Sequence, residues 1–195
     1  MSEWKAKRFW KQAQVYEEND GFGIALDARP VKTPAKRTLV VPTRGFADAI
    51  AAEWDAQGEQ IDPSSMPFTR SANAAIDKVA TQHTEVAEML AAYGDSDLLC
   101  YRAGYPDVLI ARQQEQWDPI LDWAAEVLGA RLEPRSGVMH APLDPDVLDS
   151  LTARVRAQTA IELAGFHDQV SLSGSLILAF APTHDLFSPK AIWEI

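Results

Sequence analysis

The spacing of the apolar residues changes character near Pro42-Thr43, and this change constrains the fold more than any other feature of the chain. Before it, three short apolar segments at residues 9–17, 23–32 and 38–41 follow the pattern of strands. Asn19-Asp20-Gly21 between the first two is a strong hairpin-turn signal. We therefore expect a small antiparallel sheet, which is too small to be stable without a covering layer.

After Pro42, the apolar residues recur at helical spacing. Thr43 is a suitable N-cap, and Phe46, Ile50 and Trp54 then share one helical face, which makes Trp54 a core residue. Proline is well placed in the first turn of a helix. Further helices are therefore predicted to start at Asp62-Pro63, Met66-Pro67, Pro106, Asp144-Pro145 and Ser188-Pro189.

Two proline positions and one glycine affect the predicted helices in the second half of the chain. Asp118-Pro119 either caps a new helix after Trp117 or kinks the existing one. Residues 170–181 are predicted to form one buried helix that Pro182 stops, with Gly174 letting neighbouring helices pack closely. The fold class is α+β, with a small N-terminal antiparallel β domain (residues 1–43) followed by a larger α-helical bundle domain (residues 44–195).

Composition and charge exclude several classes of protein. The single cysteine, Cys100, cannot form an internal disulfide, which indicates a reducing, cytoplasm-like compartment. Neither a signal core nor an apolar run long enough to insert in a membrane is found. Glu3, Glu17 and Glu18 argue against a mitochondrial transit peptide. The net charge of −10 argues against a nucleic-acid partner.

The residues that most often carry chemistry are scattered. No histidine has zinc-type spacing to another histidine or to Cys100, so we expect neither a metal site nor a cofactor. Ser173-Gly174-Ser175 lacks the flanking glycines of a nucleophile elbow. Asp95 and Asp97 are interpreted as helix caps, although paired carboxylates can also do acid–base work or bind a cation.

A polar stripe and one tryptophan are the candidates for contact with a partner. Arg70, Asn73 and Asp77 share one helical face, which is either a partner-binding patch or a solvated face with a local Asn73–Asp77 contact. Trp123 departs from the apolar stripe around it and is a candidate for a domain junction or an exposed groove. An alternative function is an enzyme acting on a small acidic or phosphorylated metabolite through Arg70, Arg102, Asp95 and Asp97.

Several short segments are spread over nearly the whole chain: LDARPVKTP (26–34), AAEWDAQG (51–58), IDP (61–63), MP (66–67), TR (69–70), AN (72–73), SDLLCYR (96–102), WDP (117–119), SGSLIL (173–178) and Trp193. In this order they resemble the assembly chaperones of the F-type ATP synthase that bind the unassembled α subunit of its catalytic head, F(1). The resemblance implies a β domain followed by a helical domain, no catalysis, and a role in shielding the α subunit until the β subunit takes it. It also implies action in the cytoplasm for a bacterial member and in the mitochondrial matrix for the eukaryotic relatives.

This interpretation sets the expected roles of individual residues and the expected partner. The partner is the α subunit, and we expect the protein to be a monomer. Family members continue past the Trp193 position with an acidic, tryptophan-containing segment, so a chain that stops at Ile195 is expected to be C-terminally truncated. The partner-binding candidates are Arg70, Asn73, Asp77, Arg102 and Trp123, and the structural candidates are Trp54, Trp117, Pro119 and Gly174.

Overall fold

A computed structural model describes residues 7–195, which form two compact units. The first unit ends at Gln82, and the second covers His83–Ile195. The small antiparallel sheet near the N-terminus and the helices that follow it confirm the predicted α+β class. The sequence places the domain boundary after Thr43, whereas the units divide after Gln82 because the next two helices belong with the sheet.

The sheet is built around one central strand. β2 (Gly21–Leu26) pairs antiparallel with β1 (Ala13–Glu18), β3 (Arg29–Pro30) and β4 (Val40–Val41). The turn between β1 and β2 follows the predicted signal. Gly21 has a φ of 150°, and a Cβ there would collide with the Val41 carbonyl oxygen, so only glycine fits. The second predicted segment, residues 23–32, is divided between β2 and β3 by a turn at Asp27.

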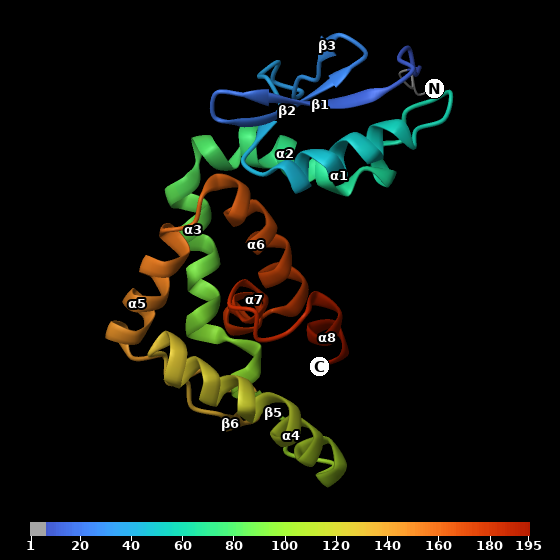
Figure 1. The fold of residues 1–195 in the computed structure, drawn as a ribbon. Coiled ribbons are helices and arrows are strands. Elements are labelled where there is room, and N and C mark those ends of the chain that lie inside the picture. Colours follow the sequence, from blue (N-terminus) through green and yellow to red (C-terminus); the bar gives the residue numbers. More distant parts are fainter. Residues whose placement is uncertain (1–6) are drawn as a thin grey trace, which may run out of the picture. The chain divides into compact units, whose positions relative to one another are not determined.

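Helices complete the core of the first unit. They are α1 (Arg44–Asp55) and α2 (Pro67–Asp77), with short 3₁₀ turns η1 (Pro63–Ser65) and η2 (Val79–Thr81). Thr43 caps α1 as predicted, because its side chain accepts the Phe46 N–H. Figure 1 shows the sheet, in blue, lying over α1. Buried Ala47, Ile50 and Ala51 of α1 form a core with the buried side chains of β2.

The second unit is mostly helical and surrounds one apolar helix, α7 (Leu176–Thr183). Every residue of α7 from Leu176 to Ala181 is buried, and α7 packs on α4, α6, α8 and η3. This unit also contains α3 (His83–Ala91), η3 (Ala92–Ser96), η4 (Leu98–Cys100), β5 (Tyr101–Arg102), α4 (Asp107–Trp123), a π-helical turn η5 (Ala124–Leu128), β6 (Arg135–Ser136), α5 (Pro145–Arg156), α6 (Ala160–Ser173) and α8 (Pro189–Glu194).

The predictions for residues 170–182 are wrong in detail, and one of the two alternatives for Asp118-Pro119 is not found. The single helix predicted over residues 170–181 is two helices, because Gly174 takes a left-handed φ of 69° and ends α6, and Ser175 caps α7. Gly174 therefore ends a helix, and its carbonyl accepts the Leu98 N–H of η4 at 3.2 Å. Pro182 lies inside α7, which continues to Thr183. At Asp118-Pro119 no new helix starts, since α4 runs through both residues. Within residues 7–195, no helix is both long and apolar enough to cross a membrane.

Candidate functional site

The polar stripe on α2 is tied to a neighbouring loop. The Asp77 carboxylate accepts hydrogen bonds from Thr33 Oγ1 at 2.7 Å and from the Ala35 N–H at 2.9 Å. Arg37 reinforces this connection by donating to the Ile76 carbonyl at 2.7 Å. Asp77 thus anchors the loop before β4 through Thr33 and Ala35, and not through Asn73, which was one of the two alternatives for this stripe. Arg70 is exposed on the same helix, and Asn73 is half-buried.

Arg102 occupies an interior position. Its side chain is 8% exposed, and Nη1 lies 2.7 Å from Asp118 Oδ1. The guanidinium also donates to the carbonyls of Leu99 and Gln113 and lies 5.3 Å from the centre of the Trp117 ring. These contacts join η4 and β5 to α4. Arg102 is therefore placed to hold the unit together and has little surface to offer a partner.

The two carboxylates Asp95 and Asp97 act separately. Asp97 is buried and accepts the Leu99 and Ile177 N–H groups, each at 3.0 Å, which confirms its interpretation as a cap. Burial raises the pKa of Asp97 to about 6, and the hydrogen bonds to its carboxylate oppose part of this rise. Asp95 is not the cap that the sequence predicted, because it lies within η3, where it accepts the Leu143 N–H at 2.7 Å and lies 3.2 Å from His140 Nε2.

Apolar side chains from η4, α4, α6, α7 and α8 line a hollow of about 400 Å³, which we call the apolar groove. Three large side chains in it are unusually exposed for their type: Leu98 (43%), Leu172 (75%) and Trp193 (79%). Trp117, which was predicted to be structural, also lines the groove, and its ring lies against Arg102. The remaining lining residues are Gln169, Ser173, Leu178, Pro182, Ile192 and Ile195.

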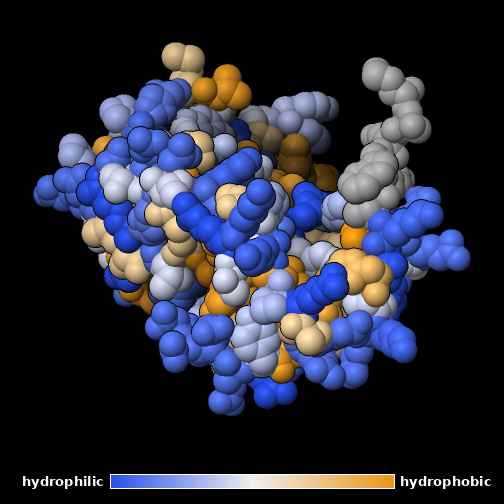
Figure 2. Space-filling model, turned by 90° about the horizontal axis from the view of Figure 1, so that it is seen from above, coloured by the Kyte–Doolittle hydropathy of each residue, from blue (hydrophilic) through white to orange (hydrophobic). Residues whose placement is uncertain are grey.

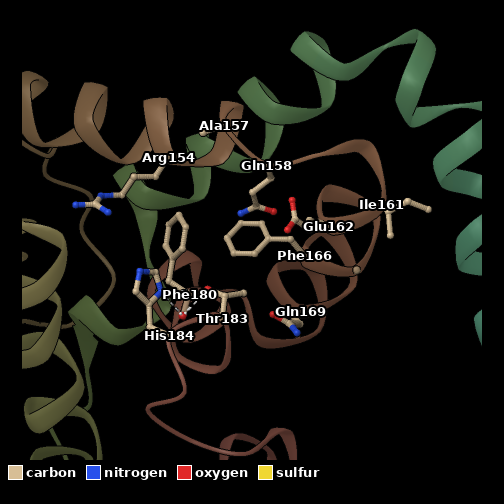
Figure 3. Close-up of a pocket in the computed structure, with 11 residues that line it drawn as sticks. Arg154, Ala157, Gln158, Ile161, Glu162, Phe166, Gln169, Phe180, Thr183 and His184 are labelled. Atoms are coloured by element: carbon tan, nitrogen blue, oxygen red, sulfur yellow. Dashed lines mark hydrogen bonds between the residues drawn. The ribbon is translucent and has the colours of Figure 1, made fainter. Parts of the chain in front are cut away.

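A second hollow of about 510 Å³ lies where α5, α6 and α7 meet, and Figure 3 shows the side chains around it. Its apolar part is formed by Phe166 and Phe180, whose ring centres are 4.8 Å apart. Among its polar residues, Glu162 caps α6 with Thr159, Arg154 donates to the Leu128 carbonyl at 3.4 Å, and Gln158 Oε1 and Gln169 Oε1 are buried without a hydrogen-bond partner. None of the large apolar side chains that line it is as exposed as Leu98, Leu172 or Trp193 of the apolar groove. The hollow is therefore a weaker candidate for binding than the apolar groove.

Trp123 lies near this second hollow. Its ring is half-buried and contacts His184 edge to face, with ring centres 5.6 Å apart. His184 lines the second hollow, while Trp123 lines neither hollow. A third, smaller hollow of about 230 Å³, lined partly by Asp118 and Asp122, is polar.

Leu98 and Leu172 are functional candidates that the sequence interpretation missed. A signal was present for Leu172, because Leu163, Phe166 and Val170 form the buried face of α6 and Leu172 departs from it. Leu172 is thus the same kind of candidate as Trp123, an apolar side chain outside the buried stripe of its helix. Leu98 had no comparable signal, since its exposure depends on the path of η4.

Charge is distributed unequally between the two units. Residues 83–195 contain 17 Asp and Glu against 7 Lys and Arg, a net charge of −10, whereas residues 1–82 contain 11 of each. The helical unit thus carries the whole net charge of the chain.

On the face that Figure 2 shows, hydrophilic side chains dominate and hydrophobic ones appear in small areas between them. Among residues 7–195, no cluster of three or more His, Cys, Asp or Glu side chains could hold a metal ion.

The fold and the groove define a two-unit α+β protein whose candidate site is an apolar binding surface. Residues 7–125 match the model of the ATP12 chaperone protein family, and the chain belongs to this family. It is 26% identical over 187 residues to "Protein atp12, mitochondrial" from Schizosaccharomyces pombe. That match covers 89% of this chain and 64% of the relative, so the chain spans less than two thirds of the relative's length.

Solved structures of the family agree with the fold. The crystal structure of Atp12 from Paracoccus denitrificans is 47% identical, with a TM-score of 0.93, and the match covers 97% of this chain and 82% of that one. A mutant of the same protein is 48% identical, also with a TM-score of 0.93, covering 98% and 82% of the two chains. The family resemblance noted from the sequence is confirmed.

Proposed function

We propose that this protein is a non-catalytic chaperone for assembly of the F-type ATP synthase, and that it binds and shields the unassembled α subunit of F(1). The observation that carries the proposal is the apolar groove, where Leu98, Leu172 and Trp193 are exposed. Contiguous exposed apolar surface of this kind marks sites of protein interaction. Membership in the ATP12 chaperone protein family supports the same assignment.

The groove suits a protein that holds an unassembled subunit. A subunit that awaits its neighbour exposes apolar surface that would otherwise aggregate. A partner that binds this surface lowers the concentration of the free subunit and keeps more of it in solution. We propose that the chaperone acts as a monomer in the cytoplasm, as expected for a bacterial member of the family.

The alternative of a metabolic enzyme has less support. It requires Arg70, Arg102, Asp95 and Asp97 to act together on one small molecule. Asp97 is buried among backbone N–H groups, and Arg102 is paired with Asp118. The three hollows described above are lined by none of these four residues.

Co-expression with an isolated α subunit tests the proposal. The soluble fraction of α should rise when the chaperone is present, and the two proteins should elute together in size-exclusion chromatography. Co-expression with an isolated β subunit is the control for specificity and should produce no such complex. Unchanged α solubility together with separate elution of the two proteins would reject the proposed function.

A further inference from the structure

Leu172 is a strongly exposed apolar side chain of the apolar groove. It is 75% exposed, although the same helix buries Leu163, Phe166 and Val170 on its other face. Trp193 of α8 is 79% exposed and lines the same groove. A groove with exposed apolar side chains on two helices can receive apolar side chains from a partner segment.

The charged residues beside the groove are mainly acidic. Asp168 lies one helical turn before Leu172, Glu194 is next to Trp193, and Asp185 follows Pro182 by three positions; all three are exposed. Lys190 on α8 is an exposed base nearby, and His167 Nδ1 lies 3.3 Å from the Asp168 carboxylate. Asp118, next to Trp117, is already paired with Arg102. Acidic residues thus outnumber basic ones next to the groove lining, within a unit whose net charge is −10.

We infer that the apolar groove binds a client segment whose apolar side chains are flanked by lysine or arginine. Basic flanks complement the acidic surroundings of the groove. This charge complementarity speeds association of the segment with the groove and favours one position of the segment along it. A second copy that docked by its own helical unit would bring the same acidic surroundings and would be repelled. The inference rests on the proposed function only in that the client would be the α subunit.

Two labelled peptides with the same short apolar core, one flanked by lysines and one by glutamates, test the inference directly. The lysine-flanked peptide should bind at least about tenfold more tightly, as measured by fluorescence anisotropy. Its affinity should fall severalfold as salt is raised from about 50 to about 300 mM, because salt screens exposed charges. Equal binding of both peptides would overturn the charge part of the inference.

Matched variants locate the site. Leu172→Asp should weaken binding of the lysine-flanked peptide at least about tenfold, whereas Val138→Asp, at an 87% exposed position outside the groove lining, should leave it unchanged. Asp168→Lys should weaken binding roughly threefold, and Asp149→Lys on α5, which changes the net charge equally, should have a smaller effect. Unchanged binding by a folded Leu172→Asp variant would overturn the assignment to the groove.

Two further outcomes separate this inference from the proposed function. If the α subunit binds the Leu172→Asp variant as well as it binds the parent protein, the groove assignment fails and the proposed function stands. If the parent protein ignores the α subunit but binds the lysine-flanked peptide in the groove, the proposed client fails and the inference stands. Concentration-dependent dimerisation abolished by Leu172→Asp, seen by sedimentation, would show that a second copy occupies the groove and would overturn the inference.

Discussion

Asp97 connects two segments of the second unit that lie far apart in the sequence. Its carboxylate accepts the Leu99 N–H in η4 and the Ile177 N–H in the first turn of α7. Both donors belong to backbone groups that lack a partner within their own helix. The side chain is 1% exposed, so it satisfies these donors at the expense of its own hydration.

This burial predicts a pH dependence of stability. The pKa of Asp97 is raised from 3.8 to about 6, mainly by desolvation. Between these two values the folded protein holds a proton that the unfolded chain releases. Its contribution to the free energy of unfolding should therefore decrease as pH rises from about 4 to about 6, by on the order of 3 kcal/mol.

Urea unfolding of the parent protein and of Asp97→Asn over this pH range measures the effect. The difference in unfolding free energy between the two proteins should change within the window and level off above it. Asp149→Asn, on the exposed face of α5, is the control and should follow the parent. Parallel profiles for the parent and Asp97→Asn would contradict the expected titration.

Trp54 illustrates how a sequence stripe can overstate burial. The stripe predicts a core residue, and the side chain is half-buried, with its ring edge to face against Trp10 at 5.2 Å. Trp10 is the buried member of the pair, at 4% exposed. Trp54 thus closes the core over Trp10 instead of lying inside it.

Trp54→Ala should lower the free energy of unfolding by about 2–4 kcal/mol, since it uncovers Trp10 and removes an aromatic pair. Trp54→Phe retains a ring and should cost less. Chemical denaturation measures both variants, and the exposed Trp193→Ala should change stability by less than about 0.5 kcal/mol. A Trp54→Ala protein as stable as Trp193→Ala would show that the pair contributes little.

At the scale of elements, α2 depends on a cap supplied by α1. The residue before α2, Met66, makes no capping hydrogen bond with its side chain. The Glu53 carboxylate instead accepts the N–H groups of Phe68 at 2.6 Å and Thr69 at 2.8 Å, and the Thr69 hydroxyl at 2.7 Å. A carboxylate at this end also interacts favourably with the helix dipole.

Glu53→Ala should therefore lower the free energy of unfolding by about 1–3 kcal/mol, the range for loss of a cap with charged hydrogen bonds. Guanidinium denaturation is the measurement. Glu59→Ala removes an exposed carboxylate of the same unit and should stay within about 0.5 kcal/mol of the parent. Equal stability of the two variants would mean that water replaces Glu53 without cost.

At the scale of the whole molecule, the first unit needs its helices. The buried face of β2, which includes Ile24 and Leu26, packs on Ala47, Ile50 and Ala51 of α1. The loop before β4 is in turn held by Asp77 at the end of α2. A sheet without α1 and α2 would leave its apolar face in water.

We therefore expect a fragment of residues 1–82 to fold and a fragment of residues 1–43 to remain unfolded. Circular dichroism and amide-proton dispersion in NMR spectra distinguish the two states. The longer fragment should also show a cooperative unfolding transition, as small single domains do. A folded 1–43 fragment would restore the boundary that the sequence suggested.

Features that depend only on neighbouring residues could be predicted before the structure was known. The turn at Asn19-Asp20, the cap at Thr43 and the helix start at Met66-Pro67 all follow from local backbone preferences, and the structure has each of them. Gly174 shows the limit of such reasoning. Apolar spacing continues on both sides of it, and a single left-handed residue divides the segment into two helices.

Only the tertiary structure decided which polar residues serve the fold and where the candidate site lies. Asp77 bonds to Thr33, Glu53 caps α2, and Arg102 pairs with Asp118, each across a connection whose geometry no local preference fixes. The apolar groove likewise takes its lining from five separate elements. Exposure of Leu98 and Leu172 depends on how these elements pack, because burial is a property of the assembled core and not of the residue type.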